Sequence, residues 1–331
     1  DHLLPRPNAS GFVYGGLINL ADDAAIANVA VWLARDYVNY ATKGEARLDA
    51  QYGSYVASGY VGHVGSYTTA SGTSGTSALE DVTWSIRRGD DGKNTLVIFP
   101  TGGVFGMVRD FSATDERLIA PCGRYSAYFN QFERVALPAP IEFHGSLQGM
   151  FDGCTALSKL DLTGVPFGAS NTDLSYMLRG CTSLTRVTNK VADPEYTGTP
   201  SILAVDGAFL PPFAAAETGV RMLDGCTGLD SVSLSGFAAG AKADLSYMLA
   251  GAGAEGSAFS LENVGASAPS ANLSHMMDGA HVASVDLTAV GQGADADLSY
   301  MTANCTSLGN VTYMNVGTGT GANASYMMSG C

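Results

Sequence analysis

Three aspartates in this chain recur within the same short motif and could form a ladder of metal ligands. Asp173, Asp244 and Asp297 each precede the letters Leu-Ser-Tyr. Calcium takes carboxylate oxygens as ligands, so a charged residue in every copy would favour a calcium site. Other copies carry Asn, Ser or Thr here, and all these residue types can accept a hydrogen bond from the first N–H groups of a helix. The pattern therefore favours helix capping, and we predict neither a metal site nor a cofactor.

The remaining polar residues do not predict catalysis. The motif serine recurs in five copies, whereas an enzyme needs one activated nucleophile beside a base. The five histidines stand in no constellation with Cys, Ser or paired carboxylates. The glycine-rich stretch 101–106 lacks the lysine of a phosphate-binding loop. We therefore predict no catalytic residues and no enzymatic activity. The five serines are Ser175, Ser246, Ser274, Ser299 and Ser325.

The motif belongs to a repeat that is centred on a methionine and recurs at intervals of about 26 residues. A capping residue type lies four positions before each methionine, and Gly or Asn lies three positions after it. Gly and Asn tolerate the left-handed conformation that ends a helix. Each copy therefore predicts a helix of little more than one turn, which is stable only against its neighbours. The centres are Met150, Met177, Met222, Met248, Met276, Met301 and Met327.

The rest of each copy predicts a strand. A small apolar residue, Cys or Ala, follows the Gly or Asn, and then comes an L-x-x-L-x-L pattern such as Leu157, Leu160 and Leu162. The last two apolar positions alternate with a polar one, as in a half-buried strand. One short strand and one short helix per copy predict an α/β repeat solenoid of the leucine-rich-repeat type, with about seven coils. Five of the six cysteines share the small apolar position, so we interpret them as core residues; Cys122 lies outside the repeats.

The segments MFDGCTALSKLDLTG, DLSYMLRGCTSLTRV and DLSYMTANCTSLGNVTY resemble the BspA-like leucine-rich repeats of bacterial surface proteins. The stretch ahead of them is similar to the β-rich lead-in of such proteins, so the resemblance covers about residues 79–331. It implies a role in adhesion and contact with a host or matrix, and it supplies no catalytic residues. Copies four and five depart from the pattern, with Ala in place of Cys and His275 in place of Tyr.

The chain divides into four predicted parts. Residues 1–65 form a helical N-terminal module, and residues 66–80 form a Gly/Ser/Thr linker. Residues 81–145 form a β-rich cap on the first coil, and residues 146–331 form the repeats, with an insertion at 188–217. The helical part could instead pad the first coil. The cap is expected to bury Trp84, Leu96, Ile98 and Phe99.

Two groups of residues are candidates for ligand binding. Tyr196, Phe209 and Phe213 are the aromatic residues of the insertion, the type that dominates binding hot spots. Alternatively, they fold back over the edge of the stack. The second group lies at outward strand positions, where a polar row could hydrogen-bond a glycan or a protein, or could simply be solvated. That row includes Asp161, Ser233, Asp286 and Thr312, with Thr188 and Ser260 at equivalent positions.

The composition of the chain limits the kinds of partner that we expect. The net charge is −14 and the pI is near 4.6, whereas nucleic-acid binding needs a basic face, so no nucleic-acid partner is expected. No apolar run reaches the length of a membrane span. We predict a non-enzymatic adhesin or binding module outside a bacterial cell or on its surface, with a protein or glycan partner. The alternative is a structural or receptor-binding subunit of a larger assembly, such as a phage tail fibre on a virion surface. The last coil lacks a polar cap, so it could support self-assembly.

Overall fold

The computed structural model describes the repeats almost completely and the N-terminal region in part. Residues 1–47 lie outside the description, as do several internal segments. The described residues are 48, 51–61, 65–68, 74–77, 82–100, 106–112, 130–137, 141–162, 172–190, 206–211, 213, 216–238 and 243–331.

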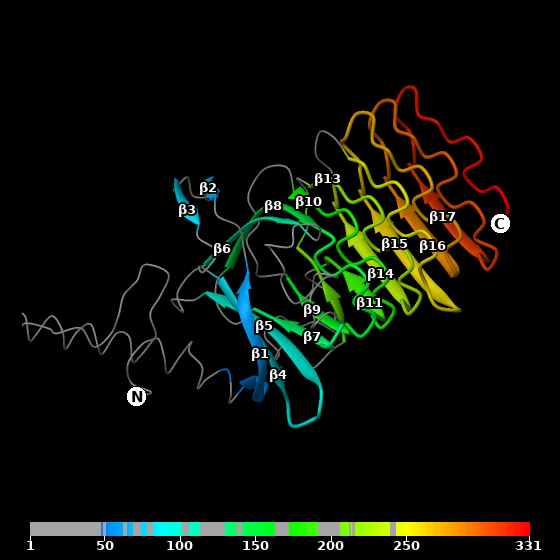
Figure 1. Ribbon diagram of the computed structural model, residues 1–331. Helices are drawn as coiled ribbons and strands as arrows, with labels where there is room; N and C mark the ends of the chain where they lie inside the picture. Colours follow the sequence, from blue (N-terminus) through cyan, green and yellow to red (C-terminus); the bar gives the residue numbers. More distant parts are fainter. Residues whose placement is uncertain are drawn as a thin grey trace, which may run out of the picture.

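One 11-stranded sheet runs through the molecule (Figure 1). Its N-terminal part is antiparallel and joins β1 (Ser54–Val61), β4 (Val82–Arg88) and β5 (Asn94–Pro100). From β5 onward every neighbouring pair is parallel. The parallel strands follow in the spatial order β7 (Arg134–Ala136), β9 (Lys159–Asp161), β12 (Gly207–Phe209), β11 (Arg186–Thr188), β14 (Ser231–Ser235), β15 (Ser257–Glu262), β16 (Val282–Thr288) and β17 (Asn310–Met314).

Three two-stranded sheets complete the strand set of the described residues. β2 (Gly65–Thr68) pairs antiparallel with β3 (Ser74–Ser77). β6 (Gly106–Ser112) pairs parallel with β8 (Ile141–Gln148), the strand that enters the first coil. β10 (Thr172–Asp173) pairs parallel with β13 (Ala216–Thr218), and isolated bridges continue this contact through the later capping residues. The coils are therefore joined on two sides, by the main sheet and by the capping residues.

A large apolar core follows the stack from the cap to the later coils, and a smaller separate cluster joins Leu48, Tyr52, Val97 and Ala136. The large core begins with Trp84, Leu96 and Ile98 of the predicted cap and reaches Cys305. The first six repeat methionines are buried, and Met327 packs against the same cluster. Because a buried residue at each repeat position meets its equivalent one coil away, the core is continuous although each coil is thin.

The predicted fold class, a leucine-rich-repeat solenoid with one helix in each coil, is wrong. Among the described residues, helix occurs only at Leu48, Gln51 and Tyr52. The segments predicted as helices are runs of turns. The residue before the methionine has a positive φ, for example 60° at Tyr176, 57° at Tyr247 and 55° at Tyr300. An α-helix needs φ near −63°, so the chain is not helical at this position.

Backbone hydrogen bonds explain why turns replace helices. In the turn segment of the second repeat, around Met177, every other N–H donates a hydrogen bond within the same segment, such as the Met177 N–H to the Leu174 carbonyl at 3.1 Å. The alternate N–H groups donate to the following coil, such as that of Tyr176 to the Val220 carbonyl at 2.9 Å. A helix would satisfy the same groups internally. The stack instead satisfies half of them between coils, so the turn depends on its neighbour for both packing and hydrogen bonding.

Several sequence-based boundaries also differ from the structure. β1 lies inside the predicted helical module and joins the main sheet, and β2 and β3 occupy much of the predicted linker. The insertion contributes β12, which enters the sheet between β9 and β11. Residues 81–145 contain β4 to β7 and the start of β8, as a β-rich cap requires. In the part of the chain that is described, no helix is long and apolar enough to cross a membrane.

Candidate binding surface

The outward strand positions predicted from the sequence form one continuous row. Asp161 of β9 pairs with Phe209 of β12, which in turn pairs with Thr188 of β11. The register continues to Ser233 and later members of the row. The whole row therefore reads Asp161, Phe209, Thr188, Ser233, Ser260, Asp286 and Thr312. Because neighbouring strands lie about 4.8 Å apart, these side chains make a ladder along the stack.

Exposure increases along this row from Phe209 and Thr188 towards β17. Phe209 and Thr188 are buried, each with 3% of its surface accessible. Asp161, Ser233 and Ser260 are half-buried, and Asp286 and Thr312 are exposed. Flanking positions on the same strands are also small and polar, such as Ser284 and Thr288 of β16. The accessible part of the row is thus the hydroxyl and carboxylate surface of β14 to β17, which we call the sheet face.

The two aromatic residues of the insertion that the structure describes, Phe209 and Phe213, are buried. Phe209 lies within the sheet, and Phe213 is 7% accessible with its ring edge-on to Phe237, at a centroid distance of 5.9 Å. Tyr196 lies outside the described residues. Phe209 and Phe213 therefore stabilise the stack rather than contact a ligand, in agreement with the alternative in which they fold back.

A second ordered surface, which the sequence did not single out as a site, follows the turns. The rings of Tyr247, His275, Tyr300 and Tyr326 stack in succession, with centroids 4.7, 4.8 and 5.1 Å apart and nearly parallel planes. All four residues occupy the position before the repeat methionine. The recurrent tyrosine of that position was the available signal. His275 replaces a tyrosine without interrupting the ladder because its flat ring fills the same place.

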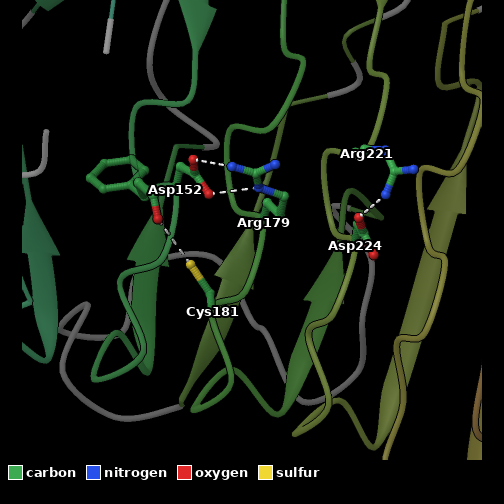
Figure 2. A network of polar contacts seen from close by, with 6 residues as sticks. Asp152, Arg179, Cys181, Arg221 and Asp224 are labelled. Atoms are coloured by element: carbon green, nitrogen blue, oxygen red, sulfur yellow. Dashed lines mark hydrogen bonds and ion pairs between the residues drawn. The ribbon is translucent and has the colours of Figure 1, made fainter. Parts of the chain in front are cut away.

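Charged residues extend this turn surface towards the first coils. The Arg179 guanidinium donates two hydrogen bonds to the Asp152 carboxylate, at 2.8 and 2.6 Å, and lies 4.6 Å from the centre of the Tyr176 ring. These hydrogen bonds raise the pKa of Arg179. Arg221 pairs with Asp224 at 2.6 Å on the next coil, as Figure 2 shows. Opposite charges alternate along the surface, so it carries little local net charge.

The aspartates accept hydrogen bonds from backbone N–H groups as the capping interpretation predicts, but they do so at the start of a run of turns and not of a helix. Asp244 Oδ1 accepts hydrogen bonds from the Ser246 N–H at 3.1 Å, from the Ser246 hydroxyl at 2.8 Å and from the Asn272 side-chain amide at 3.1 Å. Asp173, Asn272, Asp297 and Asn323 cap the serine two positions later in the same way. The described residues contain no group of three or more His, Cys, Asp or Glu side chains placed to hold a metal ion.

The repeat cysteines are free thiols, and four of them lie in the core as predicted. The Cys226 thiol donates to the Leu178 carbonyl of the preceding coil at 3.1 Å, and the Cys305 thiol donates to the Met277 carbonyl at 3.1 Å. Burial raises the pKa of Cys154, Cys226 and Cys305 to about 12. A thiolate is the reactive form, so these cysteines are chemically inert at neutral pH. Cys331 is exposed.

Lys159, on β9, carries a buried ammonium group. Its side chain is 3% accessible, and its Nζ atom has no hydrogen-bond partner. Burial lowers the pKa of Lys159, and the negative charges of nearby Asp206 and Asp161 partly offset this decrease. This lysine lies on the same strand as Asp161, the first member of the outward row.

Comparison with family models, curated proteins and solved structures finds no match to this chain. The geometry of its own residues is therefore the basis for a functional proposal.

Proposed function

We propose that this chain is a non-enzymatic binding module that works outside the cell and contacts a glycan or a protein through the sheet face. The supporting observation is the in-register row of Ser233, Ser260, Asp286 and Thr312 on β14 to β17. Each strand contributes a hydroxyl or a carboxylate at the same height. Hydroxyls donate and accept hydrogen bonds, and carboxylates accept them, so the row complements ligands rich in hydroxyl or amide groups.

The scaffold favours binding because it is ordered before a ligand arrives. Hydrogen bonds join neighbouring coils both in the sheet and in the turns. In the sheet, Leu234 of β14 pairs with Leu261 of β15, and in the turns the Leu249 N–H donates to the Met276 carbonyl. A preformed surface avoids much of the entropy cost of ordering side chains and loops on association. The small side chains of the sheet face also lose little rotamer freedom.

Charge favours some ligands over others. The chain carries a net charge of −14, and the sheet face includes the carboxylates of Glu262 and Asp286. Lys190 pairs with Glu262 at 3.5 Å. A neutral glycan or a protein surface with basic residues therefore fits better than a polyanion.

Glycan and matrix-protein arrays test this proposal, with three proteins compared on each array. Ser260→Arg places a long cation in the middle of the row, and we expect it to abolish at least one interaction of the unchanged chain. Ser307→Arg is the matched control, because Ser307 is exposed and lies outside the strands. Equal binding by all three proteins would refute the assignment of the sheet face.

A further inference from the structure

A line of basic residues crosses the sheet next to the outward row. Arg134 of β7 pairs with Lys159 of β9, and Lys159 pairs with Gly207 of β12. Arg186 of β11 follows, since a Cβ atom added to Gly207 would lie 3.1 Å from the Cβ atom of Arg186. The residue after each of these four belongs to the apolar core, so the four lie on the outward side of the sheet. Three cations therefore share one register line in a chain whose net charge is −14.

The strand between Lys159 and Arg186 contributes no side chain to this line. Neighbouring strands lie about 4.8 Å apart, so the backbones of β9 and β11, with β12 between them, are about 10 Å apart. Gly207 is the residue of β12 at this position. The side chains of Lys159 and Arg186 therefore leave the sheet on either side of a residue that cannot fill the space between them. We call Arg134, Lys159, Gly207 and Arg186 the basic cradle.

The ammonium group of Lys159 is unsatisfied within this cradle. The residue is 3% accessible, and its Nζ atom has no hydrogen-bond partner. The negative charges of Asp206 and Asp161 act to raise the pKa of Lys159 against the effect of burial, but neither carboxylate accepts a hydrogen bond from it. Nearly all buried donors in proteins are paired, so an unpaired one indicates that an ion or a water supplies the acceptor.

We propose that the basic cradle binds a tetrahedral oxyanion of the phosphate or sulfate class between Lys159 and Arg186. An ammonium group has three donors, and a guanidinium group presents donors in a fork that matches two phosphate oxygens. A water molecule would accept a hydrogen bond from Lys159 but would leave the charges of the two cations uncompensated. Arg134 is held by an ion pair with Asp91, so it fixes the edge of the cradle rather than contacting the anion. Asp206 is exposed, so solvent and salt weaken its repulsion of the anion.

This inference does not depend on the proposed function, because the basic cradle lies on β7, β9, β12 and β11, whereas the sheet face lies on β14 to β17. Urea unfolding with increasing inorganic phosphate tests it, at a constant ionic strength set with sodium chloride. A ligand that binds only the folded chain multiplies the folded-to-unfolded ratio by one plus the ligand concentration divided by Kd. Phosphate at about ten times its Kd should therefore raise this ratio about elevenfold.

Two lysine variants separate this contact from the general stabilising effect of phosphate, which is excluded from protein surfaces. Lys159→Met should show only that general effect. Lys190→Met is the matched control, because Lys190 pairs with Glu262 and lies outside the cradle, and it should respond to phosphate like the unchanged chain. Arg186→Gln should weaken phosphate binding about tenfold, through the loss of a hydrogen bond between charged groups.

The proposal is overturned if Lys159→Met and the unchanged chain gain equally from phosphate, or if Lys190→Met loses the gain as well. Glucose 6-phosphate under the same conditions distinguishes a free ion from a phosphate ester. A gain that matches that of inorganic phosphate supports an ester on a larger ligand, and a gain with inorganic phosphate alone supports a free ion.

Discussion

Tyr300 offers a direct test of the turn geometry, because two effects of opposite sign meet in this residue. Its φ is 55°, in the left-handed region that glycine adopts readily and other residues do not. Its ring stacks between His275 at 4.8 Å and Tyr326 at 5.1 Å. We therefore compare Tyr300→Ala with Tyr300→Gly. Both remove the ring, but only glycine relieves the backbone.

The expected magnitudes follow from these two contacts and the backbone. Two aromatic pairs are worth about 0.5–1.5 kcal/mol each, so Tyr300→Ala should lower the free energy of unfolding by about 1–3 kcal/mol. Glycine in a left-handed position is more stable than alanine by about 1 kcal/mol. We expect Tyr300→Gly to lower the free energy of unfolding by about 1 kcal/mol less than Tyr300→Ala.

Urea unfolding of the two variants measures this difference, with the neighbouring residue as a control. Ser299 does not have a positive φ, so Ser299→Ala should be more stable than Ser299→Gly by about 0.5–1 kcal/mol. The order of the two variants is therefore expected to reverse between adjacent residues. If Tyr300→Ala proves as stable as Tyr300→Gly, or more so, the left-handed turn is not the conformation of this segment in solution.

Iodoacetamide at pH 8 should modify Cys331 but not Cys226 in the folded protein, because burial raises the pKa of Cys226 to about 12; peptide mass spectrometry shows the sites, and labelling of native Cys226 would contradict its burial. Asp244→Ala should lower the free energy of unfolding by about 1–3 kcal/mol through the loss of its three hydrogen bonds, whereas Asp244→Asn should retain most of it; equal losses in urea titrations would argue against the capping role. Phe213→Ala should lower the free energy of unfolding by about 3–5 kcal/mol, because it leaves a cavity in the core. Thermal unfolding measures this loss, and the exposed Asp286→Ala is the control, which should change the free energy of unfolding by less than about 0.5 kcal/mol. Lys159→Met should raise the free energy of unfolding by about 1–3 kcal/mol at pH 7. Because the pKa of Lys159 is lowered on folding, the free energy of unfolding of the unchanged chain rises with pH, so the difference between the two proteins should become smaller. A difference that grows in urea titrations at alkaline pH would refute this prediction.

The sequence was most informative about the ends of each turn. The closing residue has a positive φ in all seven copies, between 56° at Asn304 and 80° at Gly330, as the choice of Gly or Asn predicted. The capping residues, the buried methionines and the outward row also lie where the repeat placed them, except that Thr188 of the row is buried. These features depend on residue type at a fixed spacing, so a single sequence contains them.

The middle of the turn and the insertion depended on contacts that the sequence does not encode locally. A capping residue, a methionine and a glycine at this spacing are compatible with a one-turn helix and also with consecutive turns. These two conformations differ in the acceptor of the Tyr176 N–H, which would lie within the same coil in a helix and lies on the next coil in the structure. Tyrosine is an unusual residue at positive φ, which concealed the turn. Likewise, the aromatic residues of the insertion suit a binding loop or a core, and only the pairing of Phe209 with Asp161 places Phe209 in the sheet.

The amino-acid sequence by itself determined the repeat, its register and the residues that face the core, because a residue's polarity and its tolerance of φ are local properties. The tertiary structure decided that each coil is made of strand and turns, since the stacked neighbour supplies the hydrogen-bond acceptors that an isolated segment would have to find in a helix. It also decided which part of the outward row meets solvent, because burial depends on what packs above each strand.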